Sequence, residues 1–130
     1  MEQINPHLFV YGTLLDANNR YGAYLQQHCT LLSSGKFKGL LYDMGEYPGA
    51  IANTDCEHYV YGNIYLMDEP EKILELIDDY EGCGDDQEQP NLFSRVLTII
   101  ETTDGPVECW IYVYNLPVDG LLLIKSGRYK

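Results

Sequence analysis

The alternation of apolar and polar residues predicts a protein built mainly of strands. Residues 59–67 alternate aromatic and β-branched side chains with other residues, a pattern typical of a strand with one buried face. Residues 93–101 and 107–114 have the same character. Thr103-Asp104-Gly105-Pro106 lies between them and predicts a hairpin turn. Two further short strands are predicted, one over residues 8–11 and one over residues 36–43.

The clearest helix is predicted between residues 68 and 82. Asp68 suits the N-cap and Pro70 suits the first turn, while Gly82 stands where helices commonly end. The apolar residues of this segment recur at helical spacing and predict one buried face: Ile73, Leu74, Ile77 and Tyr80. A second, weaker helix is predicted over residues 18–28, where the spacing is helical but the capping residues are poor.

Glycine and proline punctuate the rest of the chain. Residues 44–49 contain both residue types and predict a loop, and the tail from Leu116 predicts an edge strand or an irregular arm. Several strands with few helices, not in regular alternation, favour the α+β class with a mixed, barrel-like sheet. The length of 130 residues suits one small domain that spans residues 1–130.

The composition of the chain argues against several classes of binding partner. A net charge of −12 argues against nucleic acid or an anionic membrane surface as partner, because both require a cationic patch. No apolar stretch approaches the roughly 20 residues of a membrane span, and residues 1–6 lack the features of a secretory signal. The four cysteines show no C-x-x-C spacing, which predicts free thiols, a cytoplasmic location and no metal site: Cys29, Cys56, Cys83 and Cys109.

Glu81 is the candidate for acid–base chemistry. It is predicted at the C-terminal end of the helix, where the helix dipole and the adjacent Asp78 and Asp79 disfavour a further negative charge. If Glu81 is also partly buried, its pKa rises toward neutrality, as a general base that later acts as a general acid requires. The plainer alternative is a solvated glutamate at a helix end.

The segment Tyr11-Gly12-Thr13-Leu14 is the candidate for substrate binding. Gly12 permits a turn after the first strand in which successive backbone N–H groups converge on an oxygen atom. Tyr47-Pro48 places an aromatic residue beside a rigid turn, and together they could form one wall of a pocket. Tyr112 and Tyr114 share one face of a strand, so their hydroxyls are candidates to contact substrate or Glu81. Arg95 could hold a substrate carboxylate or pair with the acidic residues before it.

Taken together, these segments resemble the γ-glutamylcyclotransferase-like superfamily. The matching stretches follow the family's order from about Leu8 to about Asn115. They are Phe9-Val10-Tyr11-Gly12-Thr13-Leu14, Gly39-Leu40-Leu41-Tyr42-Asp43, Tyr47-Pro48-Gly49-Ala50-Ile51, Val60-Tyr61-Gly62-Asn63-Ile64-Tyr65, Leu76-Ile77-Asp78-Asp79-Tyr80-Glu81-Gly82, Phe93-Ser94-Arg95 and Ile111-Tyr112-Val113-Tyr114. The short chain is similar to the compact bacterial and γ-glutamylamine branch of the superfamily.

The resemblance implies a barrel-like sheet around one cavity and an enzyme without metal or cofactor. It implies that Glu81 is the acid/base and that the loop at Tyr11-Gly12-Thr13-Leu14 binds the polar end of a small γ-glutamyl substrate. The α-amine of that substrate would attack its own γ-carbonyl, releasing 5-oxoproline and an amine or amino acid. Three positions depart from the family pattern: Asn63 in place of glutamate, Phe93 in place of tyrosine, and the longer, more acidic loop over residues 83–92.

Two other functions fit the same residues. The first is a small-molecule binding module on the same fold that performs no reaction. The second is a protein-interaction domain that uses the acidic loop around Asp85 and Asp86. A lone carboxylate opposite a glycine turn favours the enzyme, because a binding module has no need of a base there. The sequence makes no prediction of oligomeric state.

Overall fold

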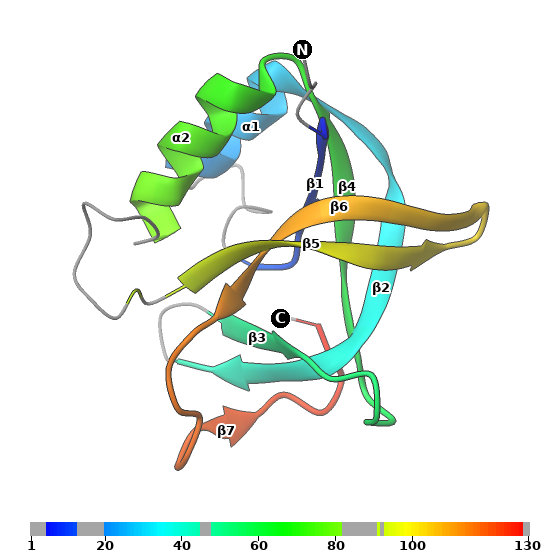
Figure 1. Cartoon of the computed structure of the whole chain (residues 1–130), viewed down its shortest axis with the longest axis vertical. Coiled ribbons are helices and arrows are strands. Elements are labelled where there is room, and N and C mark those ends of the chain that lie inside the picture. The colour runs from blue at the N-terminus through cyan, green and yellow to red at the C-terminus, as the bar shows by residue number, and fades with distance from the viewer. Residues whose placement is uncertain (1–4, 13–19, 45–47, 82–90, 92, 129–130) are drawn as a thin grey trace.

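Five strands of the chain curl into a closed barrel in the computed structural model (Figure 1). The structure describes residues 5–12, 20–44, 48–81, 91 and 93–128. The barrel order is β2–β4–β1–β6–β5, and β5 closes the barrel by pairing with β2 at Lys36 and Glu101. The elements are β1 (His7–Val10), α1 (Arg20–His28), β2 (Cys29–Asp43), β3 (Pro48–Ala52), β4 (Tyr59–Met67), α2 (Pro70–Glu81), β5 (Phe93–Thr102), β6 (Gly105–Tyr114) and β7 (Leu122–Leu123).

The sheet is mixed, as predicted. β1 pairs in parallel with β6 and antiparallel with β4, while the other pairings are antiparallel. The long strand β2 bends away from the barrel and pairs with β3 and β7 along its C-terminal half. The α+β class, the barrel-like sheet and the two helices are therefore confirmed.

Apolar residues fill the barrel and cover one side of it. The interior cluster takes side chains from every barrel strand, including Phe9, Phe37, Ile64, Ile100 and Ile111. A second cluster lies under the helices. It combines alternate residues of the barrel strands (Leu8, Val10, Tyr65, Met67, Phe93 and Tyr112) with residues of α1 and α2 (Leu25, Ile73, Leu74 and Ile77). This two-sided burial follows from the two-residue period of a strand, which sends neighbouring side chains to opposite faces.

The helix α2 confirms the clearest of the predicted helices. Its predicted apolar face is the buried one, since Ile73 and Ile77 are fully buried and Leu74 is nearly so. Figure 1 shows α1 and α2 side by side against the barrel. The hairpin of β5 and β6 and the strand β4 also lie where the sequence predicts them. Of the two alternatives predicted for the tail, the structure has the edge strand at β7, over two residues.

Two predicted boundaries are wrong. The strand predicted over residues 36–43 begins at Cys29, because its first half pairs with β4 through an irregular register between Leu31 and Ser33. The predicted loop over residues 44–49 ends early, because Pro48 and Gly49 already belong to β3. Proline is tolerated there because it occupies the first position of an edge strand, where it removes no necessary hydrogen bond.

Candidate functional site

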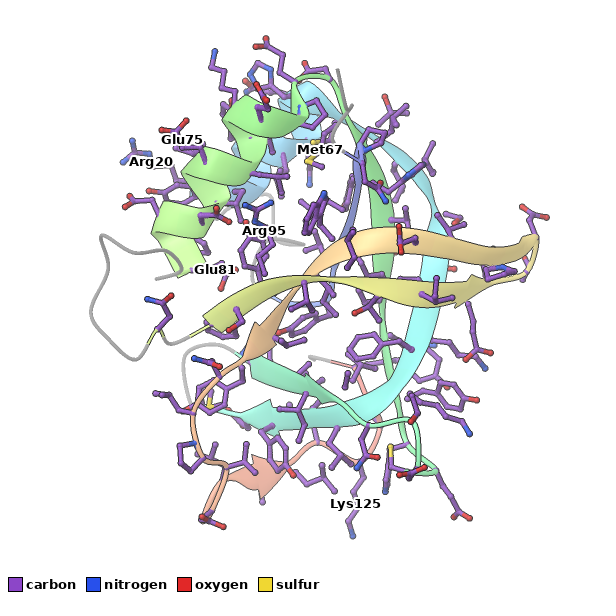
Figure 2. The ribbon with its side chains drawn as sticks, in the orientation of Figure 1. Arg20, Met67, Glu75, Glu81, Arg95 and Lys125 are labelled. Atoms are coloured by element: carbon purple, nitrogen blue, oxygen red, sulfur yellow. The ribbon has the colours of Figure 1, made fainter. Side chains whose placement is uncertain are left out.

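Glu81 is the last residue of α2 and is held against the barrel by the helix's apolar face. Ile77 lies about one turn before it and is fully buried, so the final turn of α2 cannot move freely into solvent. Glu81 itself is partly buried (Figure 2). This burial raises the pKa of its carboxyl group from the usual 4.5 to about 7, because the ionised form loses solvation.

Two tyrosines lie near the Glu81 carboxylate. Burial raises the pKa of Tyr11 and of Tyr112, and the negative charge of Glu81 adds to both increases. The Tyr11 hydroxyl donates a hydrogen bond to the carbonyl oxygen of Tyr112 at 2.6 Å and accepts one from the Ala50 N–H at 3.2 Å. It therefore ties β1, β3 and β6 together, and its proton is already engaged.

The glycine turn after β1 packs directly against the start of β3. A Cβ atom added to Gly12 would lie 2.8 Å from Cγ of Pro48, so only glycine allows this approach. Gly49 makes a similar contact, since a Cβ there would lie 3.1 Å from Cβ of Tyr114. The predicted residues Gly12, Pro48 and Tyr114 are thus neighbours in space, although they are distant in the sequence.

A buried network that the sequence did not predict fixes α2 to the sheet. Asp78, three residues before Glu81, accepts a hydrogen bond from the Tyr112 hydroxyl at 2.6 Å. Arg95 donates from Nη2 to the other Asp78 oxygen at 3.1 Å, and its Nε lies 2.8 Å from Oδ1 without a hydrogen-bonding angle. The Arg95 guanidinium also lies 4.7 Å from the centre of the Trp110 ring.

This network corrects two interpretations of the sequence. Arg95 pairs with Asp78 on α2, so the charge that the sequence offers to a substrate carboxylate already has a carboxylate partner. Tyr112 and Tyr114 do share a face, but that face packs beneath α2, and the Tyr112 hydroxyl binds Asp78 and not Glu81. The sequence indicates Asp78 only as a source of negative charge. Burial accounts for the raised pKa of Glu81.

Five of the predicted site residues are described, and the structure brings them to one side of the barrel. They are Tyr11, Gly12, Pro48, Glu81 and Tyr114. Thr13, Leu14 and Tyr47 lie outside the described residues. Within the described part of the chain, no group of three or more His, Cys, Asp or Glu side chains could hold a metal ion. None of the described helices is long and apolar enough to span a membrane.

Several known proteins are similar to this chain in sequence. The family "Gamma-glutamyl cyclotransferase, AIG2-like" matches residues 8–130. The chain is 33% identical to the gamma-L-glutamyl-butirosin B gamma-glutamyl cyclotransferase of Niallia circulans over 85% of this chain and 67% of the relative. It is 32% identical to the gamma-glutamylcyclotransferase family protein YtfP of Escherichia coli K12 over 94% of each chain. The gamma-glutamylaminecyclotransferase of Rattus norvegicus is 31% identical over 82% of this chain and 76% of the relative.

Solved structures agree on the fold. The crystal structure of an AIG2-like protein from Mus musculus superposes with a TM-score of 0.75 at 22% identity, covering 96% of this chain and 88% of the other. The crystal structure of YkqA from Bacillus subtilis superposes with a TM-score of 0.71 at 27% identity and covers 97% of this chain. The chain spans 40% of the length of YkqA.

Proposed function

The chain belongs to the gamma-glutamyl cyclotransferase, AIG2-like family, and we propose that Glu81 is its catalytic acid/base. The observation that carries this proposal is the partly buried carboxylate at the end of α2, whose pKa is raised to about 7. At neutral pH such a group is present in both forms, so it can accept a proton and return it within one catalytic cycle.

The proposed reaction is the cyclisation of a small γ-glutamyl substrate. Ionised Glu81 takes a proton from the substrate's α-ammonium group, and the resulting amine attacks the γ-carbonyl carbon. The proton then passes from Glu81 to the departing nitrogen as the C–N bond breaks. The ring nitrogen gives its remaining extra proton to the released amine, which leaves 5-oxoproline and an ammonium product. Holding the amine against the carbonyl is a positioning effect, and such effects lower barriers by up to roughly 7–11 kcal/mol.

The hydrogen bonding of Tyr11 and the packing of Gly12 support this assignment. The Tyr11 hydroxyl donates its proton to the Tyr112 carbonyl oxygen, so it does not compete with Glu81 for the proton transfer. We assign the binding of the substrate's polar end to the backbone at Gly12 and the residues after it. The packing of Gly12 on Pro48 fixes where that backbone begins.

We propose γ-glutamyl amines as the substrate class. The name of the Rattus norvegicus relative gives a γ-glutamylamine as its substrate, and that of the Niallia circulans relative gives a γ-glutamyl derivative of butirosin B. Among the described residues around Glu81, the arginine that could have bound a second carboxylate is already paired. A leaving group without a carboxylate fits this arrangement better than an amino acid.

The experiment is a panel of γ-glutamyl amines and γ-glutamyl amino acids, with 5-oxoproline measured by mass spectrometry. We expect product from the amines with wild type and a loss of about 10²–10⁴-fold with Glu81→Gln. Glu75→Gln is the matched control, because Glu75 is an exposed glutamate on the same helix (Figure 2). No product from any substrate would refute the activity, whereas full activity of Glu81→Gln would refute the role of Glu81.

A further inference from the structure

A groove of about 390 Å³ lies on the barrel wall formed by β2, β4 and the end of β5. Its lining includes Tyr11 but neither Glu81 nor Asp78, so it is separate from the proposed catalytic carboxylate. Figure 1 agrees, since the turn between β5 and β6 lies on the side of the barrel away from α2. The volume is near the lower end of the roughly 300–1,000 Å³ typical of ligand pockets, which suits a small ligand.

Two cationic side chains of the groove, Lys36 and Arg128, each lie over a tyrosine ring. Lys36 Nζ lies 4.3 Å from the centre of the Tyr59 ring, and Arg128 Cζ lies 4.1 Å from the centre of the Tyr61 ring. The two ring centres are 6.4 Å apart. Each ring therefore has one cation over it, and Lys36 and Arg128 both line the groove in a chain whose net charge is −12.

The position of Arg128 is set by the backbone that precedes it. The N–H of Tyr61 donates to the carbonyl oxygen of Gly127 at 2.9 Å, so the tail is bonded to β4. Gly127 has φ of +73°, and a Cβ there would lie 1.8 Å from the Tyr59 carbonyl oxygen, so only glycine allows the tail to dock this closely. The N–H of Arg128 also donates to the Ser126 hydroxyl at 3.2 Å.

Several polar side chains of the groove have no partner among the described residues. Neither Lys36 nor Arg128 makes an ion pair with a described residue, although the Glu101 carboxylate also lines the groove. In the part of the chain that the structure describes, the side chains of Ser34, Asn63 and Thr103 make no hydrogen bond within the protein. Two cations against one carboxylate, with free hydroxyl and amide groups, form a wall that suits an anion with polar substituents.

We propose that this groove binds a small polar ligand carrying a carboxylate or a phosphate group, held between Lys36 and Arg128. The site is distinct from the cyclisation centre, so its occupancy does not depend on the proposed activity. Tyr11 lines the groove, and its hydroxyl is bonded to Ala50 and Tyr112.

The test is an NMR titration of the full-length protein with acetate and, separately, with inorganic phosphate at constant ionic strength. We expect saturable shifts in the low millimolar range for the backbone amides of residues 34–36, 61–63 and 101–103, with the stronger probe identifying the favoured anionic group. The double variant Lys36→Gln/Arg128→Gln should weaken binding by about tenfold or more.

Lys125→Gln is the matched control, because it removes one exposed positive charge that does not line the groove. It should bind as wild type does. An unchanged amide spectrum in the absence of anion shows that each variant is folded. Shifts that are unsaturable, that occur elsewhere on the barrel, or that persist in the double variant would overturn the proposal.

Discussion

Removing the charge of Glu81 should stabilise the protein at alkaline pH even though it removes activity. Burial raises the pKa of this carboxyl group from 4.5 to about 7, so the folded state binds the proton more tightly than the unfolded state does. The stability that this proton provides is present below about pH 4.5. It is lost as the pH rises toward and through about 7, because the folded protein must then carry a partly buried charge.

The size of the effect follows from the pKa difference. The full cost of ionising Glu81 in the folded state is about 3 kcal/mol, since each pKa unit corresponds to about 1.4 kcal/mol. About 2 kcal/mol of this cost falls between about pH 5.5 and about pH 8. The Glu81→Gln variant cannot ionise, so relative to wild type it should gain about 2 kcal/mol of unfolding free energy over that interval.

The measurement is urea unfolding of wild type, Glu81→Gln and Glu75→Gln at about pH 5.5 and about pH 8. Glu75 is exposed on the same helix, so Glu75→Gln should follow the pH dependence of wild type. If Glu81→Gln also follows wild type at both pH values, Glu81 has an ordinary pKa and the reasoning fails.

Three further substitutions test how the site is held together. Asp78→Asn removes the ion pair between Asp78 and Arg95, whose side chains are only 21% and 26% exposed. It should lower the unfolding free energy measured in urea by about 1–3 kcal/mol, whereas Glu75→Gln should leave it unchanged. Tyr11→Phe removes the hydrogen bonds to Ala50 and Tyr112 and should cost about 1–3 kcal/mol in the same assay, so an unaltered midpoint would contradict the buried contacts. Gly12→Ala forces the turn away from Pro48 and should lower kcat/KM for 5-oxoproline formation by about tenfold or more, whereas wild-type kinetics would show that the turn does not position substrate.

The sequence predicts the elements whose signals are local. The helix α2 carries its own cap candidates, an apolar face at helical spacing and a glycine beyond its end, so its place and its buried side follow from residues 68–82 alone. The β5–β6 hairpin is predictable for the same reason, because its turn residues lie between two alternating segments. Glu81 could be named because it is the carboxylate at the end of the clearest helix.

What the sequence could not predict depends on distant pairings. The sequence Tyr47-Pro48-Gly49 has the residues of a turn, and only the presence of β2 beside it makes Pro48 the start of an edge strand. Asp78 meets Arg95 and Tyr112 across separations of 17 and 34 residues, which the barrel topology sets. The contact between Gly12 and Pro48 has the same origin, so the site's residue types were predictable while their contacts were not.

The pH dependence of kcat/KM for 5-oxoproline formation tests the role of Glu81 most directly. Wild type and Glu75→Gln should lose activity as the pH falls through about 7, because protonated Glu81 cannot accept the substrate's proton. The residual activity of Glu81→Gln should not fall over this pH range. If the kcat/KM of Glu81→Gln still falls as the pH drops through about 7, the assignment is wrong. It is also wrong if the kcat/KM of wild type falls only near the ordinary pKa of an exposed glutamate.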